Sequence, residues 1–362
     1  MHAHPSTGIR AMSVAFPEGR RTNDFWHERY PEIIASAERH NLAKVWSADD
    51  STDASRDFDE EMRPYTSDPF RGSVERRILA PGQLPSTLEL RAARDVMRAA
   101  GLGPEDIGLL IVGSFLPDRI GNGNAAFLAR DLGLSGAAWS IESACATVLP
   151  ALQNACALVS VGAYRHVLII VSSTYSRVLD PSDTISWFAG DGAGAWLVGP
   201  LDEGQGLLGA HLVHTGQTCG AAWYEPTMTD EGEFKAMMRS GAGTGRLFRD
   251  LAKPVLVECC LSAIDKAGVS LDDIALFAFN TPTAWYAGFG ARCLGVPRER
   301  AVNYYERYAN IGSALPTTNL YHAAEEGRLS PGDLVLVYCI GSVSSAGAVV
   351  MRWGDVGLGP AP

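Results

Sequence analysis

No apolar run in this 362-residue sequence approaches the ~20 residues that a membrane-spanning helix needs, so no transmembrane segment is expected. Basic residues are also scarce, because 30 Lys and Arg stand against 41 Asp and Glu, a formal net charge of −11. Nucleic acids and anionic membrane surfaces are bound through a basic face, so this balance argues against both kinds of partner. The N-terminus lacks a basic start followed by a long apolar stretch, and no secretory signal is expected.

Paired-cysteine motifs are absent as well. None of the seven cysteines forms Cys-x-x-Cys, and Cys259 and Cys260 are adjacent, which predicts free thiols in a reducing cytoplasm. There is no HExxH motif and no nucleophile-elbow serine, so no metal site or serine hydrolase is expected. The glycines of 241–245 follow no apolar strand, which argues against a bound dinucleotide cofactor.

What is present is an alternation of short apolar runs with helical stretches. The runs at 109–115, 137–144 and 166–173 are typical of buried strands, and a helix is expected from about Cys145 to Val161. Strands that alternate with helices indicate an α/β fold whose sheets are covered on both faces.

The sequence also contains an internal repeat. RAAGLGPEDIGLLIVGS (98–114) recurs as DKAGVSLDDIALFAFNT (265–281), an offset of 167 at Ala100, Gly101, Asp106, Ile107 and Leu109. The same offset places the strand at 167–173 on LVLVYCI at 334–340. Two matches at one offset predict a duplicated α/β unit, with a site where the halves meet.

One segment differs in composition from the rest. Residues 49–61, DDSTDASRDFDEE, hold seven acids and one Arg, a local charge of −6. The acids lack the spacing, glycine and closing Glu of a calcium loop. We therefore expect a solvated, non-catalytic surface loop or insertion.

Cys145 is the first candidate for chemistry. It lies in WSIESACATVLPALQNACALVSVG, at a predicted strand-to-helix junction, where the helix dipole would lower the thiol pKa and favour a nucleophile. A buried, inert cysteine is the alternative that position alone leaves open.

Four segments together resemble the thiolase superfamily, and more narrowly its β-ketoacyl-acyl-carrier-protein synthase III branch: ESACATVLPALQNA, GDGAGAWLV (190–198), RYANIGSALPTTNL (307–320) and LVLVYCIGSVSSAGAVVMRW (334–353). The resemblance runs from about residue 8 to 353. It implies a duplicated five-layer α-β-α-β-α architecture with halves at 1–200 and 201–362, and a homodimer. The stretch near 27–64 would be an atypical acidic insertion.

The resemblance also implies a set of site residues. Cys145 matches the nucleophile that takes an acyl group from a thioester, and Asn310 matches the Asn that binds the carbonyl of the second substrate. Gly341 and Ser342 match the glycine-rich turn whose backbone N–H would complete an oxyanion hole with that of Cys145. Such donors contribute ~3–4 kcal/mol each to stabilising the tetrahedral oxyanion.

The family's histidine is missing. Its position, just after an apolar strand, falls on Asn280 in the segment FNTPTAW. An Asn can donate a hydrogen bond to a carbonyl but cannot carry a proton near neutral pH. Glu142 is a possible auxiliary group, with a salt bridge or dimer contact as the alternative. The other histidines are expected to be structural: His27, His40, His166, His211, His214 and His322.

Without the His, the sequence favours an acyltransferase of secondary metabolism that loads Cys145 and passes the acyl group to an amine or a thiol. The alternatives are a decarboxylative 3-oxoacyl-forming ketosynthase, with Asn280 binding the extender, and a non-catalytic partner subunit. The expected substrates are acyl-coenzyme A or acyl-carrier protein, with no bound cofactor or metal, in the cytoplasm. Six basic residues are either a patch for coenzyme A phosphates or an acidic carrier protein, or scattered surface charge, and the sequence leaves both open: Arg71, Arg76, Arg77, Arg246, Arg249 and Lys253.

Overall fold

The computed structural model describes most of the chain. The described residues are 6–40, 52–53, 55–119, 121–228, 234–241, 243–341 and 345–362.

The first of two large sheets has six strands in the order β14-β1-β7-β6-β4-β5. Strands β4, β5 and β6 are parallel, and β7 is antiparallel to both β6 and β1. The bounds are β1 (Thr7–Ala15), β4 (Leu109–Phe115), β5 (Ala137–Ser140), β6 (Val167–Thr174), β7 (Asp191–Pro200) and β14 (Gly357–Leu358).

The second sheet repeats this pattern with four strands in the order β11-β12-β13-β8. Strand β11 is parallel to β12, and β13 is antiparallel to both β12 and β8, as β7 is to β6 and β1. The bounds are β8 (Gly206–His214), β11 (Ile274–Phe279), β12 (Leu334–Ile340) and β13 (Ser345–Arg352). The duplication predicted from the sequence is therefore confirmed.

Equivalent side chains of the two halves make equivalent hydrogen bonds. Asp106 accepts the N–H of Gly103 at 2.9 Å, and its counterpart Asp273 accepts the N–H of Ser270 at 2.8 Å. Each closes a short turn that leads into the first strand of the repeat.

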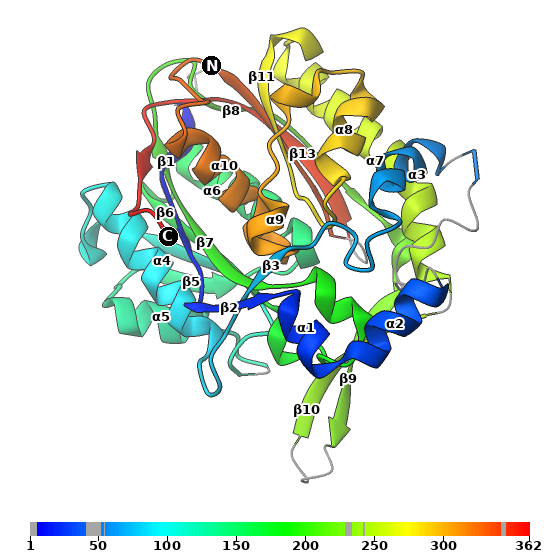
Figure 1. The fold of residues 1–362 in the computed structure, drawn as a ribbon. Coiled ribbons are helices and arrows are strands. Elements are labelled where there is room, and N and C mark those ends of the chain that lie inside the picture. The colour runs from blue at the N-terminus through cyan, green and yellow to red at the C-terminus, as the bar shows by residue number, and fades with distance from the viewer. Residues whose placement is uncertain are drawn as a thin grey trace.

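Helices complete five layers, as Figure 1 shows. α4 (Pro85–Ala99) and α5 (Ala125–Leu132) cover the outer face of the first sheet, and α7 (Thr244–Ala267) and α8 (Tyr286–Leu294) that of the second. α6 (Val148–Ser160) and α10 (Leu315–Glu325) lie between the sheets. Residues 315–323 of α10 are all buried, as expected for a helix in the central layer.

The boundary expected at residue 200 falls between β7 and β8, although β14 returns from the C-terminal end to the first sheet. The remaining helices and strands surround the two sheets. They are β2 (Gly19–Thr22), α1 (Asp24–Arg29), α2 (Pro31–His40), α3 (Arg56–Met62), β3 (Glu75–Ile78), the hairpin of β9 (Ala222–Met228) and β10 (Phe234–Ser240), and α9 (Tyr305–Tyr308).

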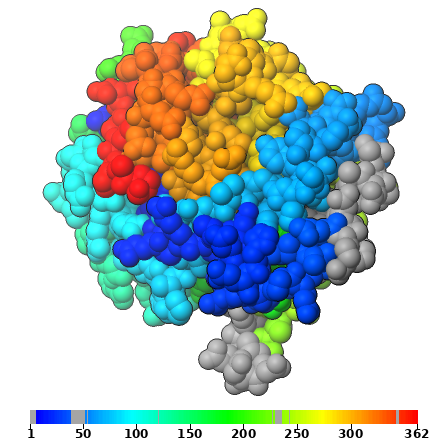
Figure 2. Space-filling view, viewed as in Figure 1, coloured from blue at the N-terminus to red at the C-terminus, as the bar shows by residue number. Residues whose placement is uncertain are grey.

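The acidic segment is not the solvated loop that its composition predicts. Residues 56–62 form α3, which packs against α7 and α8, with Phe58 and Met62 buried in the core of the second half. Figure 2 shows this blue part of the chain lying directly against the yellow and orange surface of the C-terminal half. Residues 49–51 and 54 lie outside the described residues. Local charge density misled the prediction because the neutralising bases lie far away in the sequence.

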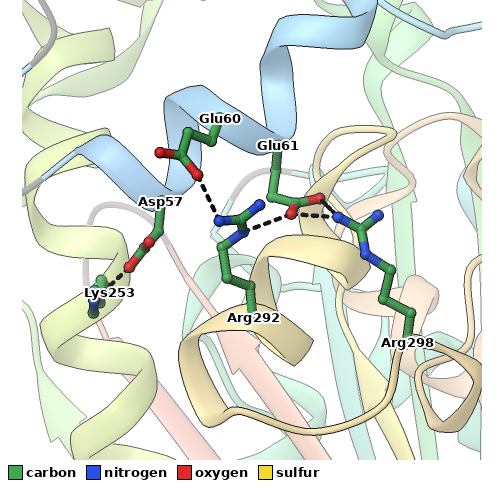
Figure 3. Close-up of polar contacts among 6 residues, drawn as sticks. All are labelled: Asp57, Glu60, Glu61, Lys253, Arg292 and Arg298. Atoms are coloured by element: carbon green, nitrogen blue, oxygen red, sulfur yellow. Dashed lines mark hydrogen bonds and ion pairs between the residues drawn. The ribbon is translucent and has the colours of Figure 1, made fainter.

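Ion pairs join α3 to both neighbouring helices (Figure 3). Asp57 pairs with Lys253 of α7, and Glu60 pairs with Arg292 of α8 at 2.5 Å. Glu61, whose side chain is only 3% exposed, accepts from Arg292 at 2.7 Å and from Arg298.

Glu61→Gln is expected to lower the free energy of unfolding by about 1–3 kcal/mol, because a buried acceptor of two charged hydrogen bonds is lost. Glu60→Gln is the matched control, since Glu60 and Arg292 are both partly exposed and such a pair contributes about 0–1 kcal/mol. Urea unfolding of both variants measures the difference. Equal stability of the two variants would contradict this ranking.

Candidate active site

A cavity of about 600 Å³ lies where the two halves meet. Its lining is mostly apolar and comes from both halves, including Phe115 and Phe188 from the first and Phe248 and Ile340 from the second. Cys145 is in its wall. The sequence thus correctly predicts that the thiol lies at a site between the halves.

Cys145 lies in a tight turn between β5 and α6, and this strand and helix are both shorter than the sequence predicts. β5 ends at Ser140 rather than near residue 144, and the regular helix α6 begins at Val148 after a 3₁₀ turn, Ala144–Ala146. The Thr147 hydroxyl accepts the Ser143 N–H at 2.9 Å and donates to the Ala144 carbonyl at 2.6 Å. Ala144 has φ of +48°, a costly conformation for a residue with a side chain. The turn therefore stores strain directly before the thiol.

Gly113 of β4 makes room for this turn. A Cβ at residue 113 would lie 2.3 Å from Cγ2 of Thr147, which is closer than any side chain allows. Gly113 thus allows Thr147, whose hydroxyl holds the turn, to pack directly against β4.

The sulfur has a phenol as its neighbour rather than an imidazole. Sγ of Cys145 lies 3.2 Å from the hydroxyl of Tyr175, which begins a 3₁₀ turn directly after β6. Sequence reasoning missed Tyr175. The signal was its position, because side chains that follow parallel strands gather at one edge of a sheet, and Cys145 follows the parallel strand β5.

The expected lowering of the Cys145 pKa is wrong in direction. Desolvation in the cavity raises the pKa of the Cys145 thiol, the hydrogen bond from Tyr175 lowers it, and the nearby charge of Glu142 raises it again. Residue 145 lies in the 3₁₀ turn and not in the first turn of α6, so the helix dipole acts on it less directly than predicted.

Glu142 belongs to the site. It lines the cavity, and its Oε1 accepts the Ala144 N–H at 2.5 Å. Desolvation raises the pKa of the Glu142 carboxyl, and this hydrogen bond partly opposes the rise. A carboxyl whose pKa is raised toward neutrality is suited to accept a proton.

Asn310 is held in the cavity wall by the backbone of the other half. Its N–H donates to the Phe188 carbonyl, and its carbonyl accepts the Gly190 N–H, both at 2.9 Å. Its Oδ1 accepts the Gly312 N–H at 2.8 Å, which orients the side-chain amide and leaves Nδ2 with no hydrogen bond to a described residue. Ala309, directly before it, has φ of +54°.

The Asn310 turn mirrors the Cys145 turn. A 3₁₀ turn, Gly312–Ala314, leads into the central helix α10, as Ala144–Ala146 leads into α6. Gly312 has φ of +54°, and a Cβ there would lie 2.3 Å from Oγ of Ser173 and 3.0 Å from the Tyr175 hydroxyl. Glycine at 312 therefore lets the Asn310 turn approach the end of β6 and Tyr175, the neighbour of the Cys145 sulfur.

Asn280 is placed differently from the other two. It directly follows β11, as expected, but it is 1% exposed and does not line the cavity. Its Oδ1 accepts the Ile340 N–H at 3.0 Å, and its Nδ2 donates to the Ile340 carbonyl at 3.4 Å. The amide thus braces the end of β12. Its assignment as a catalytic residue stays a prediction.

The role of Gly341 and Ser342 in an oxyanion hole stays a prediction. The Gly341 N–H donates to the Ser345 carbonyl at 2.6 Å, so it is not free to bind a substrate oxygen. A Cβ at 341 would lie 2.6 Å from the Ser143 carbonyl, so the glycine serves close approach of the two halves. Ser342 lies outside the described residues. The Cys145 N–H makes no hydrogen bond to another described residue and remains available as a donor.

No histidine in the described part of the chain lines the cavity. His322 is buried on α10, bonded to the Tyr308 hydroxyl at 2.8 Å and to Glu325 at 2.9 Å. His166 bonds the Asp106 carbonyl at 3.3 Å, and His211 and His214 lie on β8. His27 lies against Phe70, and the side chain of His40 is outside the description.

The basic patch considered from the sequence does not assemble. Arg76 is buried and its Nε donates to the Trp187 carbonyl at 2.6 Å, and Arg71 bonds carbonyls of its own loop. Arg249 and Lys253 pair with acids of α3. These four of the six side chains make structural contacts, a choice that the sequence had left open.

Comparison with known proteins now identifies the family. A model of 3-oxoacyl-[acyl-carrier-protein] synthase III matches residues 140–216, and the model of its C-terminal part matches residues 264–353. A β-ketoacyl-[acyl-carrier-protein] synthase III of Desulfitobacterium hafniense is 30% identical over 314 residues, covering 83% of this chain and 94% of the relative. The chain belongs to the synthase III family.

Solved structures agree with this synthase III fold. The enzyme from Thermus thermophilus has a TM-score of 0.77 at 25% identity, covering 96% of this chain and 99% of that one. The priming β-ketosynthase of the R1128 polyketide pathway has a TM-score of 0.79 at 21% identity, with 98% of each chain covered. The thiolase-like architecture expected from the sequence is confirmed.

All seven cysteines are free thiols, as predicted. Within the described ranges, no three His, Cys, Asp or Glu side chains form a group that could hold a metal ion. Among the helices that the structure describes, none is both long and apolar enough to cross a bilayer.

Tyr175→Phe is expected to slow acylation of Cys145 by about ten- to hundredfold at neutral pH, since a hydrogen bond to a charged group contributes about 1.5–3 kcal/mol. When the thiol ionises, the phenol donates to it and lowers its pKa, so loss of the phenol moves the rise of rate with pH to higher pH. Rates of thiol alkylation against pH measure this shift. Tyr224→Phe is the control, because Tyr224 lines the same cavity but its hydroxyl contacts Sδ of Met238 at 3.7 Å. The same shift in both variants would contradict the assignment.

Proposed function

We propose that this synthase III family member is an acyltransferase. It takes an acyl group from a thioester onto Cys145 and passes it to an amine or thiol acceptor. The observation that carries the proposal is the neighbour of the sulfur, which is the phenol of Tyr175 and not an imidazole that could carry a proton.

The loading step needs no net base. The Cys145 thiolate attacks the thioester carbonyl, a carbon–sulfur bond forms, and the donor's carbon–sulfur bond breaks. The proton given up by the Cys145 thiol leaves with the departing thiolate. The Cys145 N–H is an available donor for the oxyanion, and Nδ2 of Asn310 is an available donor for the carbonyl of the second substrate, which supports their predicted roles.

The transfer step differs because the acceptor loses a proton. Glu142 is the group proposed to take it, since it lines the cavity beside Cys145. Its carboxylate form is the active base, so transfer should decline as pH falls through its raised pKa. Amines and thiols need less help from a base than hydroxyls do.

Coenzyme A or phosphopantetheine thioesters are the proposed donors, which the names of the synthase III relatives support. A homodimer is also proposed. Its support is β5, the edge strand of the first sheet, where Trp139 is exposed.

A decarboxylative ketosynthase is the second candidate, because the relatives are named β-ketoacyl synthases. It requires a group that stabilises the enolate of an extender, and Asn280 is committed to the backbone of Ile340. A non-catalytic partner subunit is a weaker third candidate, since Cys145 and Asn310 both face one cavity.

Intact mass after mixing the protein with a panel of acyl thioesters tests the proposal. We expect one added acyl group with at least one donor, and its loss on addition of an amine or thiol acceptor. Absence of an adduct across coenzyme A, carrier-protein and pantetheine thioesters would overturn the proposed function.

A further inference from the structure

α3 lies across the two helices that wall the cavity on one side. Its acids reach Lys253 on α7 and Arg292 on α8 (Figure 3). Phe248 and Ala252 of α7 and Tyr286 of α8 line the cavity. The helix built from the acidic segment is therefore part of the enclosure around the site.

Phe58 is the side chain that α3 contributes to the cavity wall. Its ring is 2% exposed and meets the rings of Trp285, Tyr286 and Phe289 edge-on, at centroid distances of 5.7, 6.4 and 5.1 Å. Edge-to-face packing on three rings fixes the position of an aromatic side chain. The ring is thus a rigid part of the wall.

Contacts made by the residues that follow Phe58 on α3 hold it there. Asp59, the next residue, pairs with the buried Arg249 at 3.2 Å and accepts from the Ser55 hydroxyl at 2.6 Å. Three residues after Phe58, Glu61 pairs with Arg292 and Arg298. Gly288 of α8 lies against the Glu61 carboxylate, where a larger residue would not fit. A Cβ at residue 288 would lie 2.8 Å from Oε2 of Glu61.

We propose that Phe58 determines which acyl groups the cavity accepts, with α3 acting as a fixed wall against the acyl chain. The assignment rests on the proposed loading of Cys145. The mostly apolar lining suits an aliphatic or aromatic chain, and a rigid ring in that lining limits its length or bulk. The acidic segment thus serves substrate selection without taking part in the chemistry.

The test measures loading rates of Cys145 with acyl-coenzyme A donors from acetyl to dodecanoyl. For each variant, the loading rate of the shortest chain that the wild type rejects is divided by the loading rate of the best wild-type chain. Phe58→Ala is expected to raise this ratio by about tenfold or more, since one methylene changes the discrimination between two substrates by about ten- to two-hundredfold. Phe58→Leu gives a smaller shift in the same direction and covers the case in which the Ala variant fails to fold.

Phe277→Ala and Phe277→Leu are the matched controls. Phe277 is fully buried in the same core cluster as Phe58 but does not line the cavity. Its variants should leave the chain-length profile unchanged. A Phe58 variant that changes all chain lengths by one factor, or changes none, would overturn the proposal. Failure of the wild type to load any acyl group, whether from coenzyme A, carrier-protein or pantetheine thioesters, would instead overturn the proposed function, and this assignment with it.

Discussion

Replacing Cys145 with Ala is expected to abolish the acyl adduct completely. The thiolate is the nucleophile that forms the thioester, and no other cysteine lines the cavity formed by the described residues. The fold should survive, because the side chain is only partly buried and the turn is held by Thr147 instead. Intact mass of the variant with a donor that loads the wild type measures the loss.

Cys219→Ala is the matched control for that variant. Cys219 is an exposed free thiol in the turn after β8, with Sγ at 3.8 Å from Nε2 of His214, and it is the cysteine most open to non-specific acylation. Its removal should leave loading unchanged. An adduct that persists without Cys145 and maps to another cysteine would refute the assignment of the nucleophile.

The wild type is expected to release carbon dioxide from malonyl thioesters ~10²–10⁴-fold more slowly than a synthase III that carries the family's histidine, the range that a positioned acid–base group contributes. In decarboxylation the carbon–carbon bond breaks, its electron pair forms the thioester enolate, and carbon dioxide leaves. The enolate oxygen then needs strong donors. Asn310 offers only the neutral NH₂ group of its amide, whereas the Asn280 amide is engaged with Ile340.

Labelled malonyl thioester measures this rate directly, with acyl loading of the same sample as the internal reference. Asn280→His should raise carbon dioxide release if the imidazole reaches the cavity. Both substitutions remove the hydrogen bonds that Asn280 makes to Ile340. Asn280→Ala therefore shows the effect of that loss alone, and the difference between the two variants is the effect of the imidazole. Release by the wild type as fast as loading would make the ketosynthase the better function.

The sequence predicted the features that depend on regular repeats. Leu109 of β4 and Leu276 of β11 lie on equivalent strands, so the offset of 167 was enough to find the duplication. Cys145 and Asn310 were found from motifs, and the structure brings both to one cavity. The partner of the sulfur was missed, because Tyr175 meets Cys145 only through the order of the parallel strands.

Long-range contacts also explain why the sequence misplaced the acidic segment and the direction of the Cys145 pKa shift, and why it could not show where the Asn280 amide points. The acids of 57–61 are neutralised by Lys253, Arg292 and Arg298, nearly two hundred or more residues later in the chain, which no local pattern reveals. Asn280 follows its strand as expected, yet its amide turns to Ile340 on the neighbouring strand. The pKa of Cys145 depends on the cavity around it, and a sequence window contains only the helix start.

The alanines with positive φ at 144 and 309 give the duplication a chemical meaning. An alanine with positive φ directly precedes the thiol in the first half and the amide in the second. Neither half holds both groups, so the cavity takes its thiol from one half and its amide from the other, and neither half can form this site alone. A change that displaces either turn should therefore disable the shared site, although the two turns lie in different halves of the chain.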